Sequence, residues 1–533
     1  MADIELESKP EVSQDDALLL ELGYKQDFKR DLNLWSATAF CFSIMGVVAS
    51  VSGTMVFPFT YGGHVGIIWG WFVASVFVYA VAASLAELCS AMPTSGGLYY
   101  WSARLAPPRY AALASWLTAW MNLLGQLALV CSIEFTTAAM IADAVTISSN
   151  FNTFYSDGIK YGLMLALLTL HLIVCSSATH VLAKLNYLYV VINIGTFIAV
   201  LVVLGVMAPK QPASVAFGSF ENNSEWKSNG FAWFLSMTAA MWSLTGYDAA
   251  AHVAEETTNA AVVGPWAMFA AVAGTSTLGW ALSIMFSFCI PDPAQLLESK
   301  LYMPIVQLYY NVIGKHGALV LWSLTIVIQL NTAAAQVVDA SRVAYAFARD
   351  GGLPFSSKIA YVHPWTKSPI NAVLFTVVGA AIIGLLSLSA TAMTALASTA
   401  VIGLYISYSI PIFLRITAAG RSFEPGPWSL GRYSIPVAII ACAWVLFITV
   451  ILFFPAEPDP TPDSMNWSIL IVGAIMGGSI LFWFASARHW FKGPLYFFEA
   501  SHGTSQFSHG QAPDGTVSDK PEIGLTDFVP GSD

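Results

Sequence analysis

Polar and flexible residues interrupt an apolar stretch in the middle of the chain, Met241 to Thr257, with the sequence MWSLTGYDAAAHVAEET. Its centre holds Ser243, Thr245, Gly246 and Asp248. In hydrocarbon every backbone N–H and C=O needs a partner within the protein, so such a break is tolerated only where it lines a cavity. The first apolar segment is interrupted in the same way, by Gly46, Ser50, Ser52 and Gly53. Two broken spans at matching positions predict the binding site of a transporter.

The backbone at these breaks could recognise charge without help from a charged side chain. N–H groups freed near Ser50, Ser52 and Gly53 would form the positive end of a half-helix, which suits a carboxylate. Carbonyls freed at Thr245 and Gly246 would suit an ammonium group. Uncharged polar side chains on the third and eighth spans either face the same site or form hydrogen bonds between helices: Asn122, Gln126, Asn331 and Gln336.

The amino-acid composition indicates the class of protein in which these residues lie. Hydrophobic residues make up 56% of the 533, and charged residues 10%, against about 25% in a soluble domain. This predicts an all-α integral membrane protein embedded in the lipid bilayer. The net charge of −10 gives no reason to expect a nucleic-acid partner. Residues 1–31 are polar and mixed in charge, which predicts a cytosolic N-terminus without a cleavable signal.

Cofactor and catalytic patterns are not visible in the sequence. The six cysteines are scattered singly through apolar segments, so neither a metal site nor a disulfide framework is expected. No nucleophile–base pair or phosphate-binding loop stands out. We therefore expect a protein that is not an enzyme and has no bound cofactor.

A span length of about 20 residues divides the chain into twelve predicted spans. They are Leu32–Phe57, Val65–Met92, Tyr110–Ile141, Tyr161–Ser177, Leu185–Val206, Phe231–Val253, Pro265–Ile290, Ala318–Ala348, Ile370–Leu388, Ala392–Phe413, Ile435–Phe454 and Ser468–Ala487. With the N-terminus inside, 17 of the 22 Lys and Arg residues fall on the cytosolic side. This asymmetry predicts that both termini are cytosolic.

The spans define four predicted regions. They are a cytosolic N-terminal tail (1–31), a ten-helix core (32–416), a loop with the last two spans (417–487), and a cytosolic C-terminal tail that is largely disordered (488–533). Two sequons for N-glycosylation fall on the outer side, at Asn222 and Asn466. Asn466 lies close to a span, so Asn222 is the favoured acceptor.

Ionisable residues inside spans are rare, costly and by default functional. Four of them fall in the cytosolic halves of their spans: Asp248, Asp339, Lys184 and Arg342. They predict either an ion network at an inner gate, with Arg342 and Lys184 as partners of Asp248, or a static buried network. Glu134, toward the outer end of the third span, is expected to reach the headgroup level.

Several motifs resemble the amino acid/polyamine/organocation transporter superfamily: LAELCSAMPTSGGLYYW, WSLTGYDAAAHVAEET and SRVAYAFARDGGLP. ELGYKQDFKRDLNLW and EPGPWSLGR resemble its fungal branch of GABA, amino-acid and choline permeases. The resemblance implies a LeuT-type core, in which spans one to five and six to ten are related by inversion, with two further spans outside it. It also implies a substrate held at mid-membrane between spans one, three, six and eight, and covered by Trp242, whose aromatic face attracts a cation.

From these patterns we expect a secondary-active permease that works by alternating access. Its predicted substrates are small amino acids or related zwitterions, with GABA favoured; choline is the first alternative and a transporter-like nutrient sensor the second. Some related bacterial transporters carry a proton on a lysine in the fifth span, where this chain has Asn193, so H+ coupling is left open. The plasma membrane is favoured over the vacuolar membrane, and the sequence leaves the oligomeric state open.

Overall fold

The computed structural model describes residues 13–177, 179–388, 392–461 and 465–494. Its regular secondary structure is helical throughout this part of the chain, with one isolated parallel bridge between Leu32 and Thr257. Eleven of the described helices are long and apolar enough to cross a membrane. The structure thus confirms the prediction of an all-α integral membrane protein.

The first five spans are helices that fall close to their predicted positions. Their bounds are α2 (Leu34–Met45) with α3 (Val47–Thr54), α6 (Trp71–Ala91), α8 (Ala111–Ser148), α9 (Asp157–Cys175) and α10 (Thr179–Met207). Short helices lie between them, α4 (Val56–Tyr61), α5 (Gly63–Val65), η1 (Gly66–Gly70) and α7 (Gly97–Leu105), and α11 (Ala213–Gly218) follows the fifth span.

The predicted sixth span is divided into short helices, each of which is too short to cross a membrane alone. They are α12 (Asn229–Ser236), α13 (Thr238–Ser243), α14 (Ala249–His252) and η2 (Ala254–Glu256). The count of twelve spans depends on joining these pieces and stays a prediction, as does the inverted repeat. The breaks in the first and sixth spans are confirmed.

The remaining spans are long helices. They are α15 (Ala260–Cys289), α17 (Pro304–Arg349), α19 (Ile370–Gly384), α20 (Ala392–Leu414), α21 (Ser434–Leu452) and α22 (Ser468–Phe482). Pro304 begins α17 at a position where its missing N–H costs nothing. Gly314, at φ 69°, kinks the same helix.

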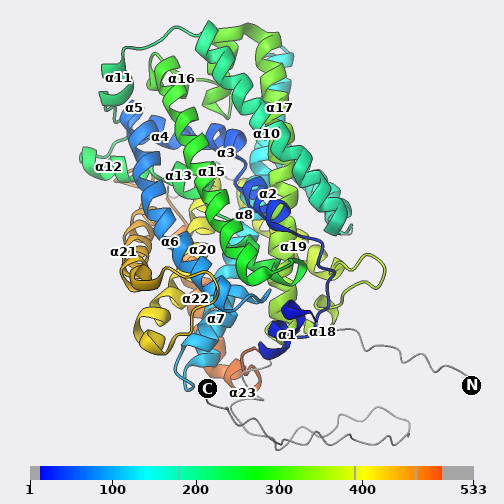
Figure 1. Cartoon of the computed structure of the whole chain (residues 1–533). Coiled ribbons are helices and arrows are strands. Elements are labelled where there is room, and N and C mark those ends of the chain that lie inside the picture. Colours follow the sequence, from blue (N-terminus) through cyan, green and yellow to red (C-terminus); the bar gives the residue numbers. More distant parts are fainter. Residues whose placement is uncertain (1–12, 178, 389–391, 462–464, 495–533) are drawn as a thin grey trace, which may run out of the picture.

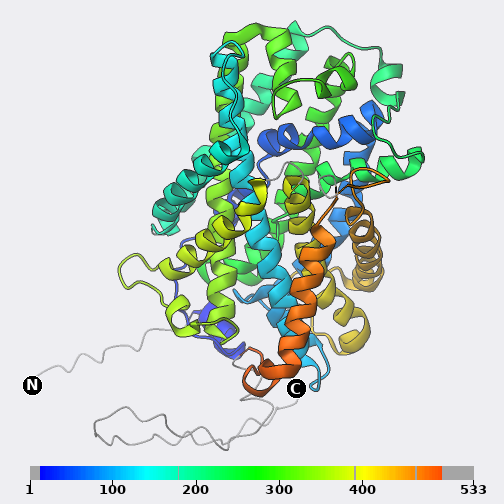
Figure 2. The same ribbon diagram turned by 180° about the vertical axis from the view of Figure 1, so that it is seen from behind.

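The two ends of the bundle carry different short elements (Figure 1). Helices α1 (Gln14–Glu21), α7, α18 (Ser356–Ile359) and α23 (Arg488–Trp490) gather at one end, called here the terminal end. Helices α4, α5, α11 and α16 (Pro293–Leu297) lie at the other, called the opposite end. Between them α8 runs through the bundle, with α17 and α20 packed against it (Figure 2).

Candidate functional site

The first break lies at Gly46, which adopts the left-handed conformation with φ 50° and ψ 58°. A Cβ atom at this position would lie 2.3 Å from Thr332 Oγ1 of α17, so only glycine fits. The hydroxyl of Thr332 donates a hydrogen bond of 2.9 Å to the carbonyl of Ser43, in the last turn of α2. The neighbouring span thus supplies a partner for backbone at the break, as hydrocarbon requires.

This position corrects the prediction that N–H groups near Ser50, Ser52 and Gly53 are free. All three residues lie within α3, and the Ser50 N–H donates to the carbonyl of Gly46 at 2.8 Å. Since α3 begins at Val47, the N–H groups without an acceptor in their own helix are those of its first turn, from Val47 to Ala49. The positive end of the half-helix is therefore one turn earlier than expected.

The second break follows Ser243, the last residue of α13, and contains Gly246 at φ +97°. A Cβ atom on Gly246 would lie 2.4 Å from Ile44 Cγ2 of α2, so the two breaks pack directly on each other. The prediction of a free carbonyl at Gly246 is wrong, because this oxygen accepts a hydrogen bond of 3.3 Å from the N–H of Ala249. The Cys41 thiol lies 3.7 Å from the carbonyl of Tyr247 and joins α2 to the break.

A cavity of about 210 Å³ lies beside the breaks, on the side of the opposite end. Its walls come from α3, α4, α8, α13, α20 and the segment just before α17, and they include Gly53, Thr54, Ser132, Thr136, Trp242 and Tyr302. The Trp242 indole donates to the Ser132 hydroxyl at 3.2 Å, and Ser243 Oγ lies 3.4 Å from Thr54 Oγ1. The volume is below the roughly 300–1,000 Å³ of pockets for drug-sized ligands, which fits a small solute.

A chain of buried amides and one carboxylate connects α8 and α17 next to the second break. Gln336 Nε2 donates to Gln126 Oε1, and Gln126 Nε2 donates to Asp339 Oδ2 at 2.9 Å. Gln336 Oε1 would lie 3.8 Å from a Cβ on Gly246. Asn122 faces α20 instead, where its Nδ2 lies 3.4 Å from Ser407 Oγ. These contacts match the alternative of hydrogen bonds between helices and leave a role in substrate binding as a prediction.

Asp248 has different partners from those predicted. Its carboxylate accepts a hydrogen bond of 2.6 Å from the Tyr408 hydroxyl of α20 and lies 3.2 Å from His252 Nε2. Arg342 pairs instead with Glu256, at 2.7 Å, and the Lys184 side chain is exposed on α10. The Asp248–His252 spacing of four residues was a readable signal in the sequence, whereas Tyr408 comes from a distant span.

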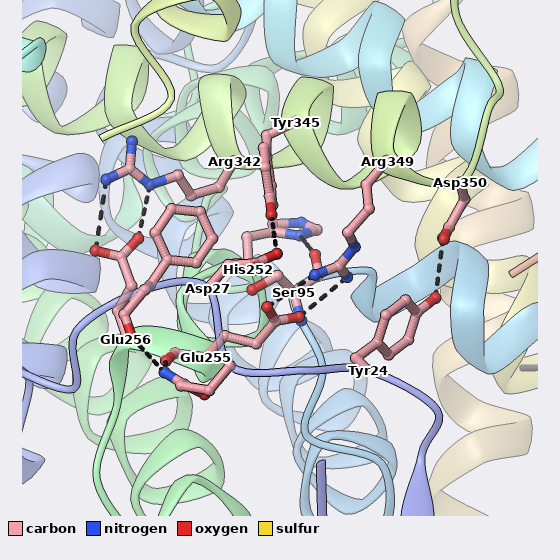
Figure 3. A network of polar contacts seen from close by, with 12 residues as sticks. Tyr24, Asp27, Ser95, His252, Glu255, Glu256, Arg342, Tyr345, Arg349 and Asp350 are labelled. Carbon is pink, nitrogen blue, oxygen red and sulfur yellow. Dashed lines mark hydrogen bonds and ion pairs between the residues drawn. The ribbon is translucent and has the colours of Figure 1, made fainter. Parts of the chain in front are cut away.

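A polar network closes the terminal end below the breaks (Figure 3). Two buried ion pairs join η2 to α17: Glu255 with Arg349 at 2.8 Å, and Glu256 with Arg342 at 2.7 Å. The Ser95 N–H, just before α7, adds a 3.1 Å hydrogen bond to Glu255. The network ties together the segment after the second break, the start of α7 and the last turns of α17.

The segment that precedes the first span takes part in this closure, although the sequence predicted only a tail there. The Tyr24 hydroxyl donates to Asp350 at 2.9 Å, and Asp27 accepts from the Tyr345 hydroxyl at 2.8 Å. The Arg349 guanidinium lies 4.0 Å from the centre of the Tyr24 ring. Burial, together with the charge of Asp350, raises the pKa of Tyr24 well above its usual range, so the hydroxyl remains a donor at physiological pH.

The two predicted glycosylation sites have different surroundings. The side-chain amide of Asn466 is buried and donates to the carbonyls of Leu452 and Phe454 at 2.8 and 3.0 Å. Asn222 is half-buried in a loop and donates to the carbonyl of Trp226 at 2.7 Å. Glycosylation of Asn466 would need that amide to leave its partners, so Asn222 remains the favoured prediction.

Comparison with known proteins identifies the family. The model of the family described as "Amino acid permease" matches residues 32–475. An uncharacterized amino-acid permease of Schizosaccharomyces pombe is 37% identical over 483 residues, covering 89% of this chain and 86% of that protein. The amino-acid permease BAT1 of Arabidopsis thaliana is 36% identical, covering 90% and 95%, and amino-acid permease 2 of Neurospora crassa is 33% identical, covering 90% and 89%. The chain therefore belongs to the amino acid permease family of the amino acid/polyamine/organocation superfamily, whose members are membrane transporters and not enzymes.

Proposed function

We propose that this permease carries small amino acids or related zwitterions, with GABA as the favoured single substrate. The observation that carries the proposal is the cavity beside the two breaks. Its described lining contains hydroxyl, aromatic and aliphatic groups but no charged side chain. A substrate with both a carboxylate and an ammonium would therefore depend on backbone groups at the breaks for charge recognition.

We infer a partner near the breaks for each charged group of such a substrate. The first-turn N–H groups of α3, with the positive end of that helix, suit the carboxylate, which would have to reach past Gly53 and Thr54, the α3 residues in the cavity wall. The Trp242 ring, held in place by Ser132, offers an aromatic face to the ammonium. At the terminal end two ion pairs tie η2 to α17, and we expect exchange of substrate with that side to require these two elements to separate.

Choline is the second candidate, and one observation favours it. Three aromatic residues, Phe57, Trp242 and Tyr302, line the same cavity. Aromatic groups of this kind are a common way to bind quaternary ammonium ions. Choline has no carboxylate, so it would leave the first-turn N–H groups of α3 without a charged partner.

Uptake by purified protein in liposomes, across a labelled substrate panel and a series of pH and Na+ conditions, tests the proposal. The decisive comparison is between the best amino acid and its carboxylate ester. A buried donor left unpaired costs about 1–3 kcal/mol, so the ester should bind roughly 5- to 150-fold more weakly. Equal competition by the ester and the amino acid would refute recognition of the carboxylate. Stronger competition by choline would favour the second candidate, and binding without uptake would favour a sensor.

A further inference from the structure

A buried acid–base pair joins α8 to α9 outside the substrate cavity. Glu134 Oε1 lies 2.6 Å from His171 Nδ1, and the two side chains are 0% and 2% exposed. Glu134 lies near the middle of α8, so the prediction that it reaches the headgroup level is wrong. An ionisable pair at this depth is costly and calls for a functional explanation.

The net charge of the pair depends on a single proton. With one proton between them, Glu134 and His171 are neutral overall; without it they carry a charge of −1 in apolar surroundings. The second carboxylate oxygen, Glu134 Oε2, is buried and has no hydrogen-bond partner among the described residues. Such an oxygen is uncommon and is where a further proton or a water molecule would be expected.

The surroundings provide little charge to compensate for a lost proton. The titratable groups that face the pair within the described structure are the thiols of Cys131 and Cys175 and the phenol of Tyr189. Arg342 acts electrostatically on Cys175, but it is already bound to Glu256. The described parts of α2 and α19 contain no charged residue. Release of the proton therefore needs access to water.

A second cavity provides a place for that water. It has a volume of about 130 Å³, lies between α2, α9, α10 and α17, and is lined by His171, Asn186, Tyr189 and Asn331. The space and its polar lining are sufficient for water molecules. Asn186 comes from α10 and Asn331 from α17, so polar groups of two further helices lie beside His171 in this cavity.

Two hydrogen bonds of the broken spans involve residues that lie close to the pair along α8 or next to the second cavity. Ser132, two residues before Glu134 on α8, accepts the hydrogen bond from Trp242. Asn331, in the wall of the second cavity, precedes Thr332, which holds the Ser43 carbonyl beside Gly46. A movement of either broken span therefore changes the surroundings of Glu134 and His171.

From this arrangement we propose that Glu134 and His171 form the proton-binding site of a proton-coupled transport cycle, an inference that rests on the proposed function. A proton from water on the opposite-end side forms an N–H bond on the His171 imidazole, and the pair passes from −1 to neutral. After the broken spans move, that N–H bond breaks and the proton passes to water in the second cavity. No electron is transferred, and one proton accompanies each substrate.

The test compares wild type with Glu134→Gln in liposomes, with the membrane potential clamped to zero by K+ and valinomycin. Two quantities are measured: exchange of labelled GABA at equal pH, and net accumulation driven by a pH gradient. One coupled proton supports about tenfold accumulation per pH unit in wild type. Glu134→Gln should retain exchange and lose this accumulation. Glu298→Gln makes the same chemical change on an exposed residue and should behave like wild type.

Each outcome separates this site from the transport function itself. Gradient-driven accumulation by Glu134→Gln equal to that of wild type would overturn the proposal, as would a wild type that exchanges GABA but ignores the gradient. Absence of exchange by wild type for every amino acid would instead refute the proposed function. If Glu134→Gln does not fold, His171→Gln carries the same test, because it removes the proton acceptor and leaves the carboxylate in place.

Discussion

The position of Gly246 makes two demands that no amino acid other than glycine can meet. Its φ of +97° is open to glycine but strained for a β-branched residue, and a Cβ atom would lie 2.4 Å from Ile44. We expect Gly246→Val to reach the membrane and to lose uptake down to background. Gly230→Val in α12 is the matched control, because the added Cβ meets no atom within 4 Å and φ there is not left-handed. Normal uptake kinetics in Gly246→Val would show that the break is not needed.

A substitution at Asp248 tests whether its contacts with Tyr408 and His252 form and break during transport or stay fixed. Asn at this position can still accept from Tyr408 and can donate to a neutral His252, so the hydrogen bonds persist while the charge is lost. If the charge acts during the cycle, Asp248→Asn should keep its abundance and substrate binding but turn over slowly. A fixed buried charge pair would instead lose about 3–5 kcal/mol of stability. Abundance that falls in proportion to uptake would therefore contradict a role in gating.

At the scale of the elements, the closure of the terminal end depends on the ion pairs between η2 and α17. Arg342→Glu places two carboxylates together and should open this end, whereas Arg342→Glu with Glu256→Arg should close it again. Cys41 reports on the change, since its thiol is buried at the breaks. In a background where the other five cysteines are serine, we expect a membrane-impermeant maleimide applied from the terminal side to label Cys41 at least about tenfold faster in the single variant.

The double variant, in which the ion pair is reversed, is the critical part of that experiment. The reversed pair has the same composition as the original one but exchanged positions, so a return to slow labelling points to the pair itself. Fast labelling in both variants would mean that Arg342 supports the fold in some other way. Unchanged labelling in the single variant would mean that the pair does not hold the end closed.

The stability that Tyr24 contributes, in the segment that precedes α2, should depend on pH. Tyr24→Phe removes one hydrogen bond to Asp350 and should cost about 1 kcal/mol at pH 7. Because the folded pKa of Tyr24 is raised, its contribution is complete below about pH 10 and is lost as pH rises through the folded value. Thermal unfolding of both proteins should therefore show a gap at neutral pH that closes in strong alkali. A gap independent of pH would contradict burial of this hydroxyl.

For the whole molecule, the sequence predicted the features set by contact with lipid, namely the spans and their breaks. It did not predict which side chains pair between spans. A helix in lipid must be apolar, so span positions can be read from hydropathy, and glycine with polar neighbours reveals a break. The pairing of Asp248 with Tyr408, or of Glu134 with His171, joins different spans and has no local signal. The exact break was also missed, because Gly46, Ser50 and Gly53 are all plausible until Thr332 is seen against Gly46.

The N-terminal segment shows the same limit. Residues 13–31 have the composition of a solvated tail, yet Tyr24 and Asp27 find partners at the end of α17, more than 300 residues away in the chain. Charge and polarity describe how a segment interacts with water. They do not reveal whether a folded surface offers matching donors and acceptors, so docking of this kind emerges only from the assembled bundle.

The most direct test of the account is whether a transported amino acid occupies the cavity beside the two breaks. Thr136→Cys, in a background without native cysteines, places a thiol on the cavity wall, and Lys227→Cys places one on an exposed loop as the control. Labelling by a small soluble thiol reagent is measured with and without a saturating substrate. We predict that the amino acid slows labelling at Thr136→Cys, that its ester does so far less, and that neither affects Lys227→Cys. Equal labelling of Thr136→Cys with and without a substrate that the protein transports would contradict it.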